Sequence, residues 1–211
     1  MSGQALALPT RSQAQLAIGC VIAAMLALPA ARAALEQSML RHMLLQAPLL
    51  LLAGACLAGG MGPRLRAAVA RWNAYGITGL LATAGILSGL MVPRALDLAL
   101  VVPAIETTKF ALLLLAGAAL RLSWAPAGLL VQGFFLGNLL PMMAVAGQLY
   151  ADSPVRICNA YLLDDQARLG EWLIALACVA AVGWLAQVAR TMVLREERAL
   201  AAEHLPILRN Q

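Results

Sequence analysis

The chain has 211 residues, of which 62% are hydrophobic and only 12% are charged. Soluble domains have about 45–50% apolar and about 25% charged residues, so this composition excludes an ordinary soluble protein. The net charge is +5, but the arginines stand mainly between apolar runs and form no basic cluster with interleaved aromatic residues. This pattern is typical of membrane topology signals and not of a surface that binds nucleic acid.

Apolar runs long enough to cross a bilayer begin near the amino terminus, and each predicts a transmembrane helix. The first covers about residues 16–34 and contains Ala31-Arg32-Ala33, which resembles a signal-peptidase site. We expect an uncleaved first helix, with a cleaved signal peptide as the alternative. The second run covers about residues 39–60. The third covers about residues 74–93 and is rich in Gly and Ser, which allows neighbouring helices to approach closely.

Three more runs follow, at about residues 104–122, 127–150 and 169–189. We expect a turn at residues 124–126 and a hydrogen bond from Asn138 to a neighbouring helix. Residues 94–103 are expected to form a loop. The sequence therefore predicts an all-α fold: a polytopic integral membrane helix bundle of about six transmembrane helices within residues 1–190. A charged cytoplasmic tail, residues 191–211, completes the chain.

The distribution of basic residues predicts how this bundle is oriented. With six spans, nine basic residues fall on one side of the membrane and six on the other. The nine are Arg11, Arg64, Arg66, Arg71, Arg121, Arg190, Arg195, Arg198 and Arg209; the six are Arg32, Arg41, Arg94, Lys109, Arg156 and Arg168. Because the side richer in Lys and Arg faces the cytoplasm, we expect a multi-pass protein of the cell inner membrane with both termini cytoplasmic.

Candidate metal ligands stand on the side predicted to face outward. Met39, His42 and Met43 have i, i+3 and i+4 spacing and share one helix face, and Met91 closes the third helix at the same side. Imidazole and thioether groups form a soft ligand set that suits Cu(I). The alternative is that the methionines are packing residues and His42 lies at the interface. Near them, Glu106 and Lys109 have the spacing of a pair that neutralises itself on one helix.

Several motifs of enzymes are missing from the sequence. It contains no GxxxxGK[ST], GxGxxG, HExxH or GxSxG motif. Of its two histidines, His204 stands in the predicted cytoplasmic tail, so a haem held by paired histidines is not expected. We therefore predict that the chain is not an enzyme.

Three segments, in order, resemble the CtaG-type cytochrome c oxidase assembly factors, which are implicated in delivering copper to the oxidase. Residues 38–45, followed by Pro48, look like that family's His-Met-x-x-His-x-Leu-Leu opening. Residues 93–100, with Asp97, look like its Trp-His-x-Pro-x-x-Tyr-Asp segment, and residues 163–170 are similar to its Asp-Gln-x-Leu-Gly entry to the last helix. The resemblance covers about residues 36–190. It implies an assembly or accessory factor whose partners are the bilayer and a respiratory oxidase.

The chain departs from this pattern at positions where the family has histidine. Ser38 and Met91 stand at two of them, and Glu106, Lys109 and Phe110 stand where the family has His-x-x-Glu-His. Two expectations follow. Either a reduced outer-face site of His42, Met91 and Met39 or Met43 holds Cu(I), or the metal is lost and the chain is a structural accessory subunit. A small-molecule transporter is a third, less favoured class.

Overall fold

The computed structural model of the protein describes residues 11–209, and this part of the chain consists of helices and connecting loops without any strand. The predicted all-α class is therefore confirmed. A proline is the first residue of four of the helices, where its missing N–H costs no hydrogen bond. The elements are α1 (Arg11–Ala27), α2 (Pro29–Glu36), α3 (Met39–Arg41), the π-helix η1 (His42–Gln46), α4 (Ala47–Gly59), α5 (Pro63–Trp72), α6 (Ile77–Leu90), α7 (Pro93–Val101), α8 (Pro103–Asp152) and α9 (Leu163–Arg209).

Three to five segments of the described chain are long and apolar enough to cross a membrane. The helices α3, η1 and α4 join into one such segment, and α8 and α9 are the other two. The pairs α1–α2 and α6–α7 raise the number to five when each bent pair is taken as one span. These lengths fit the predicted multi-pass membrane protein.

Two predicted helix boundaries are wrong for the same reason: in each case a short helix turns away from the end of the longer one. The run predicted as one helix over residues 16–34 breaks at Leu28, and α2 is bent by 71° from α1. The predicted loop after the third helix is α7, bent by 73° from α6. Pro29 and Pro93 begin the new helices, and a proline restricts the residue before it to extended geometry, which ends the preceding helix.

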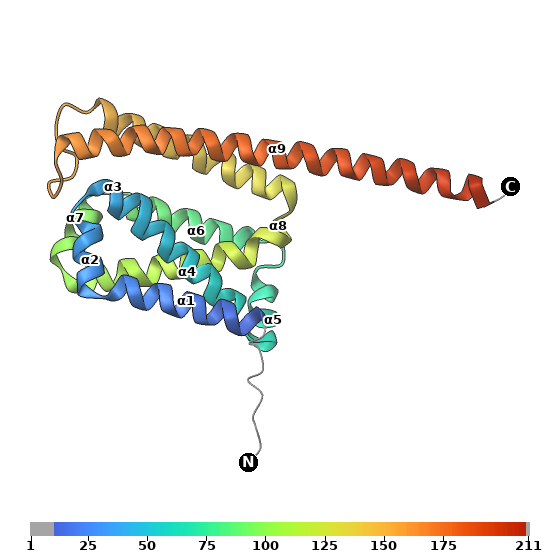
Figure 1. Cartoon of the computed structure of the whole chain (residues 1–211), viewed down its shortest axis with the longest axis horizontal. Coiled ribbons are helices and arrows are strands. Elements are labelled where there is room, and N and C mark those ends of the chain that lie inside the picture. Colours follow the sequence, from blue (N-terminus) through green and yellow to red (C-terminus); the bar gives the residue numbers. More distant parts are fainter. Residues whose placement is uncertain (1–10, 210–211) are drawn as a thin grey trace, which may run out of the picture.

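The long element α8 is divided at Gly128, whose φ of 62° and ψ of 176° are not helical. Glycine adopts a positive φ without steric cost. Figure 1 shows that the half of α8 before this residue and the half after it run in opposite directions. The turn predicted at residues 124–126 therefore exists, displaced by two residues. Asn138, in the second half, donates to the Phe134 carbonyl of its own helix at 2.7 Å, so the predicted bond to a neighbouring helix is wrong.

Glycines let α4 and the first half of α8 pack backbone to backbone. A side chain at Gly54 would meet the main chain of Leu114, and one at Gly117 would meet the main chain of Leu51. Close approach through small residues is the usual way in which membrane helices associate. On α6, predicted to use its glycines in this way, Gly79 does lie against Ser123, whereas Gly85 has open space beside it.

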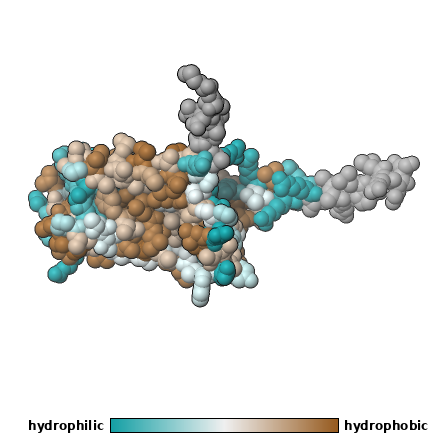
Figure 2. All heavy atoms as spheres, turned by 90° about the horizontal axis from the view of Figure 1, so that it is seen from below, coloured by the Kyte–Doolittle hydropathy of each residue, from teal (hydrophilic) through white to brown (hydrophobic). Residues whose placement is uncertain are grey.

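The helices form a bundle with two polar ends and an apolar belt between them (Figure 2). At one end, on the left of Figure 1, lie α2, α7 and the loop between α8 and α9. Seven of the ten acidic residues belong to it or to the adjoining helix ends (Glu36, Asp97, Glu106, Asp152, Asp164, Asp165 and Glu171), and we call it the acidic end. The opposite end contains α5 and the turn of α8. Because Arg64, Arg66, Arg71 and Arg121 lie there, we call it the basic end.

Candidate functional site

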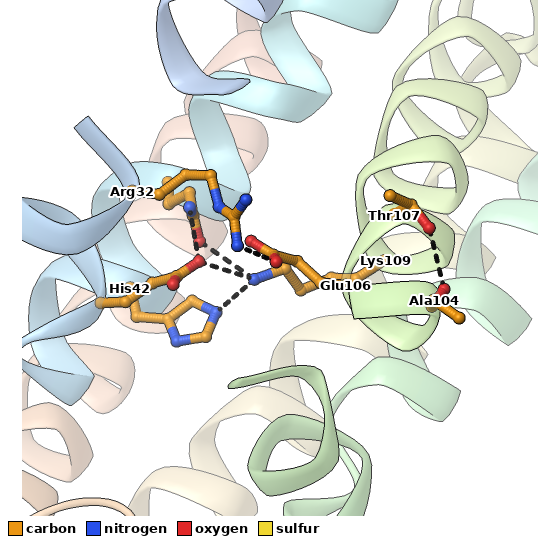
Figure 3. A network of polar contacts seen from close by, with 8 residues as sticks. Arg32, His42, Ala104, Glu106, Thr107 and Lys109 are labelled. Carbon is orange, nitrogen blue, oxygen red and sulfur yellow. Dashed lines mark hydrogen bonds and ion pairs between the residues drawn. The ribbon is translucent and has the colours of Figure 1, made fainter. Parts of the chain in front are cut away.

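Four charged side chains link α2 to α8 at the acidic end. Arg32 and Glu36 stand four residues apart on α2, and Glu106 and Lys109 stand three apart on α8. Arg32 pairs with Glu106, and the Lys109 Nζ lies 3.4 Å from the Glu36 Oε1. The expected neutralisation of Glu106 by Lys109 on one helix is therefore wrong. Each pairs across to α2 because the two helices present opposite charges in matching order (Figure 3).

Lys109 is the centre of this cluster, and the residue is only 3% exposed. Besides Glu36, its Nζ lies 3.0 Å from the His42 Nε2 and 3.3 Å from the Gln46 Oε1. An ammonium group has three donors and no acceptor, so these partners use its full capacity. The Gln46 amide donates in turn to the Glu36 Oε1 at 3.1 Å. The ammonium is thus held as a metal cation would be, by acceptors converging from different elements.

His42 is 2% exposed and both of its ring nitrogens are engaged. Its Nδ1 lies 2.6 Å from the Tyr161 hydroxyl, on the side away from Lys109. Because Lys109 donates to Nε2, the neutral ring has its proton on Nδ1 and donates it to the Tyr161 oxygen. Tyr161 is itself buried, and this burial, followed by the negative charge of Glu36, raises its pKa. The imidazole therefore has no nitrogen free for a further ligand.

A π-helical turn presents His42 and Gln46 to α8. The Ala47 N–H donates to the His42 carbonyl, five residues back, which is the π pattern. Pro48 follows directly and has no N–H for the Leu44 carbonyl, so the regular α-helical pattern is interrupted at this point. Single π turns inside α-helices are frequent at functional sites.

The loop between α8 and α9 covers His42 and is fixed by acceptors from α7 and α9. Asp97 accepts the Asn159 N–H at 3.1 Å, and the Gln166 Oε1 accepts the Ile157 N–H at 2.8 Å. Asp165 accepts the Met39 N–H at 2.5 Å and so caps α3. The Asp97 carboxylate and the Gln166 amide thus hold this loop in position, and the Asp165 carboxylate ties α9 to the start of α3.

Three of the four predicted metal ligands border one small cavity. His42, Met43 and Met91 line a space of about 50 Å³ together with Gln46 and Lys109. Met39, the fourth, is fully buried in the adjoining apolar cluster, against which Met91 also packs. As arranged, these residues do not fit a copper ion, because an ammonium lies on the imidazole nitrogen and borders the same cavity. Copper binding at these residues stays a prediction that requires Lys109 or Tyr161 to move.

Other clusters of metal-ligating groups are absent from the described residues, where no three His, Cys, Asp or Glu side chains come together. Sequence reasoning missed Arg32, Glu36, Gln46 and Tyr161 as members of the site. The complementary charge spacings on α2 and α8, and the position of the only lysine of the chain within an apolar helix, point to Arg32 and Glu36. No signal in the sequence points to Gln46 or Tyr161.

Comparison with known proteins gives no relative, since no family model, no curated protein and no solved structure matches the chain.

Proposed function

We propose that the chain is a six-span inner-membrane protein that serves as a non-enzymatic accessory or assembly factor of a larger membrane complex. Six spans are supported by the division of α8 at Gly128 into two antiparallel halves, added to the five segments of spanning length. The excess of arginine at the basic end supports a cytoplasmic location for that end. The resemblance to CtaG-type proteins supports a respiratory cytochrome oxidase as the partner.

The observation that carries this proposal is the closed cluster around Lys109. Two cations and two anions balance there, and the three donors of Lys109 are all used. The Lys109 amine and both ring nitrogens of His42 therefore already have partners, whereas the Glu106 Oε1 and the Arg32 Nε are buried without one. The mechanical effect of the cluster is to hold α2, which has no buried residue of its own, against the end of the bundle. We infer that α2, α7 and the loop after α8 form a fixed outer surface for the partner complex.

The test is to delete the gene from its host and to measure cytochrome oxidase activity and the haem spectrum of the membranes. We expect a loss of assembled oxidase that the wild-type chain restores. The double variant Arg32→Gln, Lys109→Met should restore less, at equal amounts of chain in the membrane. Arg190→Gln, an exposed change at the opposite end, is the matched control and should restore fully. Unchanged oxidase in the deletion strain would refute the proposal.

Copper handling at the acidic end is the second candidate. It is favoured by the cavity that His42 shares with Met43 and Met91, since Cu(I) accepts imidazole and thioether ligands. Retention of Cu(I) by the wild-type chain and its loss in His42→Ala would support this candidate over the metal-free one.

Transport receives no support from the cavity beside Asn138. This cavity of about 760 Å³ lies between α6 and the second half of α8, and its other lining residues are apolar except Ser88. The Ser88 hydroxyl and the Asn138 amide already have partners. The lining therefore offers no continuous polar path between the two ends of the bundle.

A further inference from the structure

A third cavity, of about 310 Å³, lies at the basic end beside α5. Arg66 from α5 and Arg121 from the first half of α8 line it, although they are far apart in the sequence. Ala58, Leu122 and Pro126 contribute apolar wall. The cavity therefore combines two guanidinium groups with a hydrocarbon surface.

The arginines of this end have no carboxylate partners in the described part of the chain. The two ion pairs among the described residues both join residues of the acidic end. Arg66 donates to the carbonyls of Ala58 and Gly59, at 3.5 and 3.2 Å, and so also caps α4. Arg121 is exposed and has no hydrogen bond or ion pair with the described residues. The charge of this cavity is thus left for an anion from outside the chain.

Aromatic residues beside the cavity indicate that it lies at the depth of lipid headgroups. Trp72, the last residue of α5, is 84% exposed, and Tyr75 is 75% exposed. Exposed Trp and Tyr collect at the boundary between hydrocarbon and water. The helix α5 has no buried residue and presents arginines beside apolar side chains, as helices that lie in this boundary do.

We propose that this cavity binds an anionic phospholipid, with the phosphate against Arg66 and Arg121 and an acyl chain along Leu122 and Pro126. Basic pockets between transmembrane helices recognise anionic headgroups in this way. A free anion would need only the two guanidinium groups, whereas a phospholipid also uses the apolar wall and the interfacial depth. The proposal is independent of the accessory role and of copper, because it concerns the opposite end of the bundle.

The experiment uses the full chain in a neutral detergent, titrated with phosphatidylglycerol, phosphatidylcholine or inorganic phosphate. Native mass spectrometry measures bound lipid, and the melting temperature measures stabilisation. We expect phosphatidylglycerol to bind and to raise the melting temperature, with little effect of the other two. Arg121→Gln should weaken phosphatidylglycerol binding roughly 5-fold, because each arginine near a headgroup contributes about that factor. The matched control, Arg94→Gln with Arg156→Gln, removes two exposed arginines at the acidic end and should bind as the wild type does.

Three results would overturn the proposal: equal binding of phosphatidylcholine, undiminished phosphatidylglycerol binding in Arg121→Gln, or equal stabilisation by inorganic phosphate, which would mean a simple anion site. Arg66→Gln would add a second measurement, but Arg66 also caps α4 and its loss affects folding. Arg121→Gln removes no hydrogen bond or ion pair with the described residues, so it decides the question alone.

Discussion

Replacing Lys109 by methionine removes the buried ammonium and keeps an apolar stem of similar length. The change leaves the Glu36 carboxylate, the Gln46 carbonyl oxygen and the His42 Nε2 without their shared donor. If each contact contributes the ~0.6 kcal/mol typical of interhelical hydrogen bonds in membranes, the three together give about 2 kcal/mol. Breaking a buried ion pair by removing one partner costs about 3–5 kcal/mol. We therefore expect the free energy of unfolding to fall by about 2–5 kcal/mol.

The assay is unfolding of the purified chain in mixed micelles, followed by far-UV circular dichroism. A loss of this size lowers the melting temperature by roughly 4–20 °C for a chain of this length. The loss in stability arises because Lys109→Met leaves the Glu36 carboxylate buried without its cation. Adding Glu36→Gln to Lys109→Met should therefore recover part of the lost free energy of unfolding, with a coupling energy of about 1–3 kcal/mol. The control, Arg190→Met, alters an exposed charge and should stay within about 0.5 kcal/mol. Additive effects of the two single changes would refute the reasoning that Lys109 and Glu36 stabilise each other.

Three further predictions concern other parts of the structure. Lys109 is the only lysine, so an amine reagent should label it in the denatured chain and leave it unmodified in the folded one; labelling of the folded chain at Lys109 would contradict its burial. Gly117→Ala should destabilise the chain by about 1–3 kcal/mol through overpacking against Leu51, whereas Gly85→Ala, beside open space, should be close to neutral in the same melting assay. Burial, with a smaller contribution from nearby negative charge, raises the pKa of Cys158 from its ordinary 9.0 to about 11. The folded chain therefore favours the neutral thiol, and the wild type should lose stability between about pH 9 and pH 11; Cys158→Ala should lose less, and equal loss in both would exclude this thiol as the cause.

The spans were predictable because their signal is local. A run of about 20 apolar residues is enough to indicate a membrane helix, and the turn near Pro126 follows from a proline close to a glycine. The short helices α2, α5 and α7 were not predicted, since their mixed composition resembles that of loops between spans. Pro29, Pro63 and Pro93 mark their starts, but a proline alone does not distinguish a new helix from a turn.

The candidate site was predictable only in part, for a different physical reason. The face shared by Met39, His42 and Met43 follows from helical spacing. The partners of His42 do not, because Tyr161 and Lys109 stand more than 60 residues away in the sequence and meet it only through packing. The bend before α2 decides whether Glu36 reaches Lys109, and the apolar run over residues 16–34 does not indicate this bend.

The measurement that tests the central claim most directly is the copper content of the detergent-purified chain after reduction and loading with Cu(I). Lys109 already occupies the place of a cation beside His42, so the wild-type chain should retain far less than one copper ion. Retention of about one Cu(I) per chain, lost in His42→Ala and kept in Arg190→Gln, would contradict the account and establish the acidic end as a copper site.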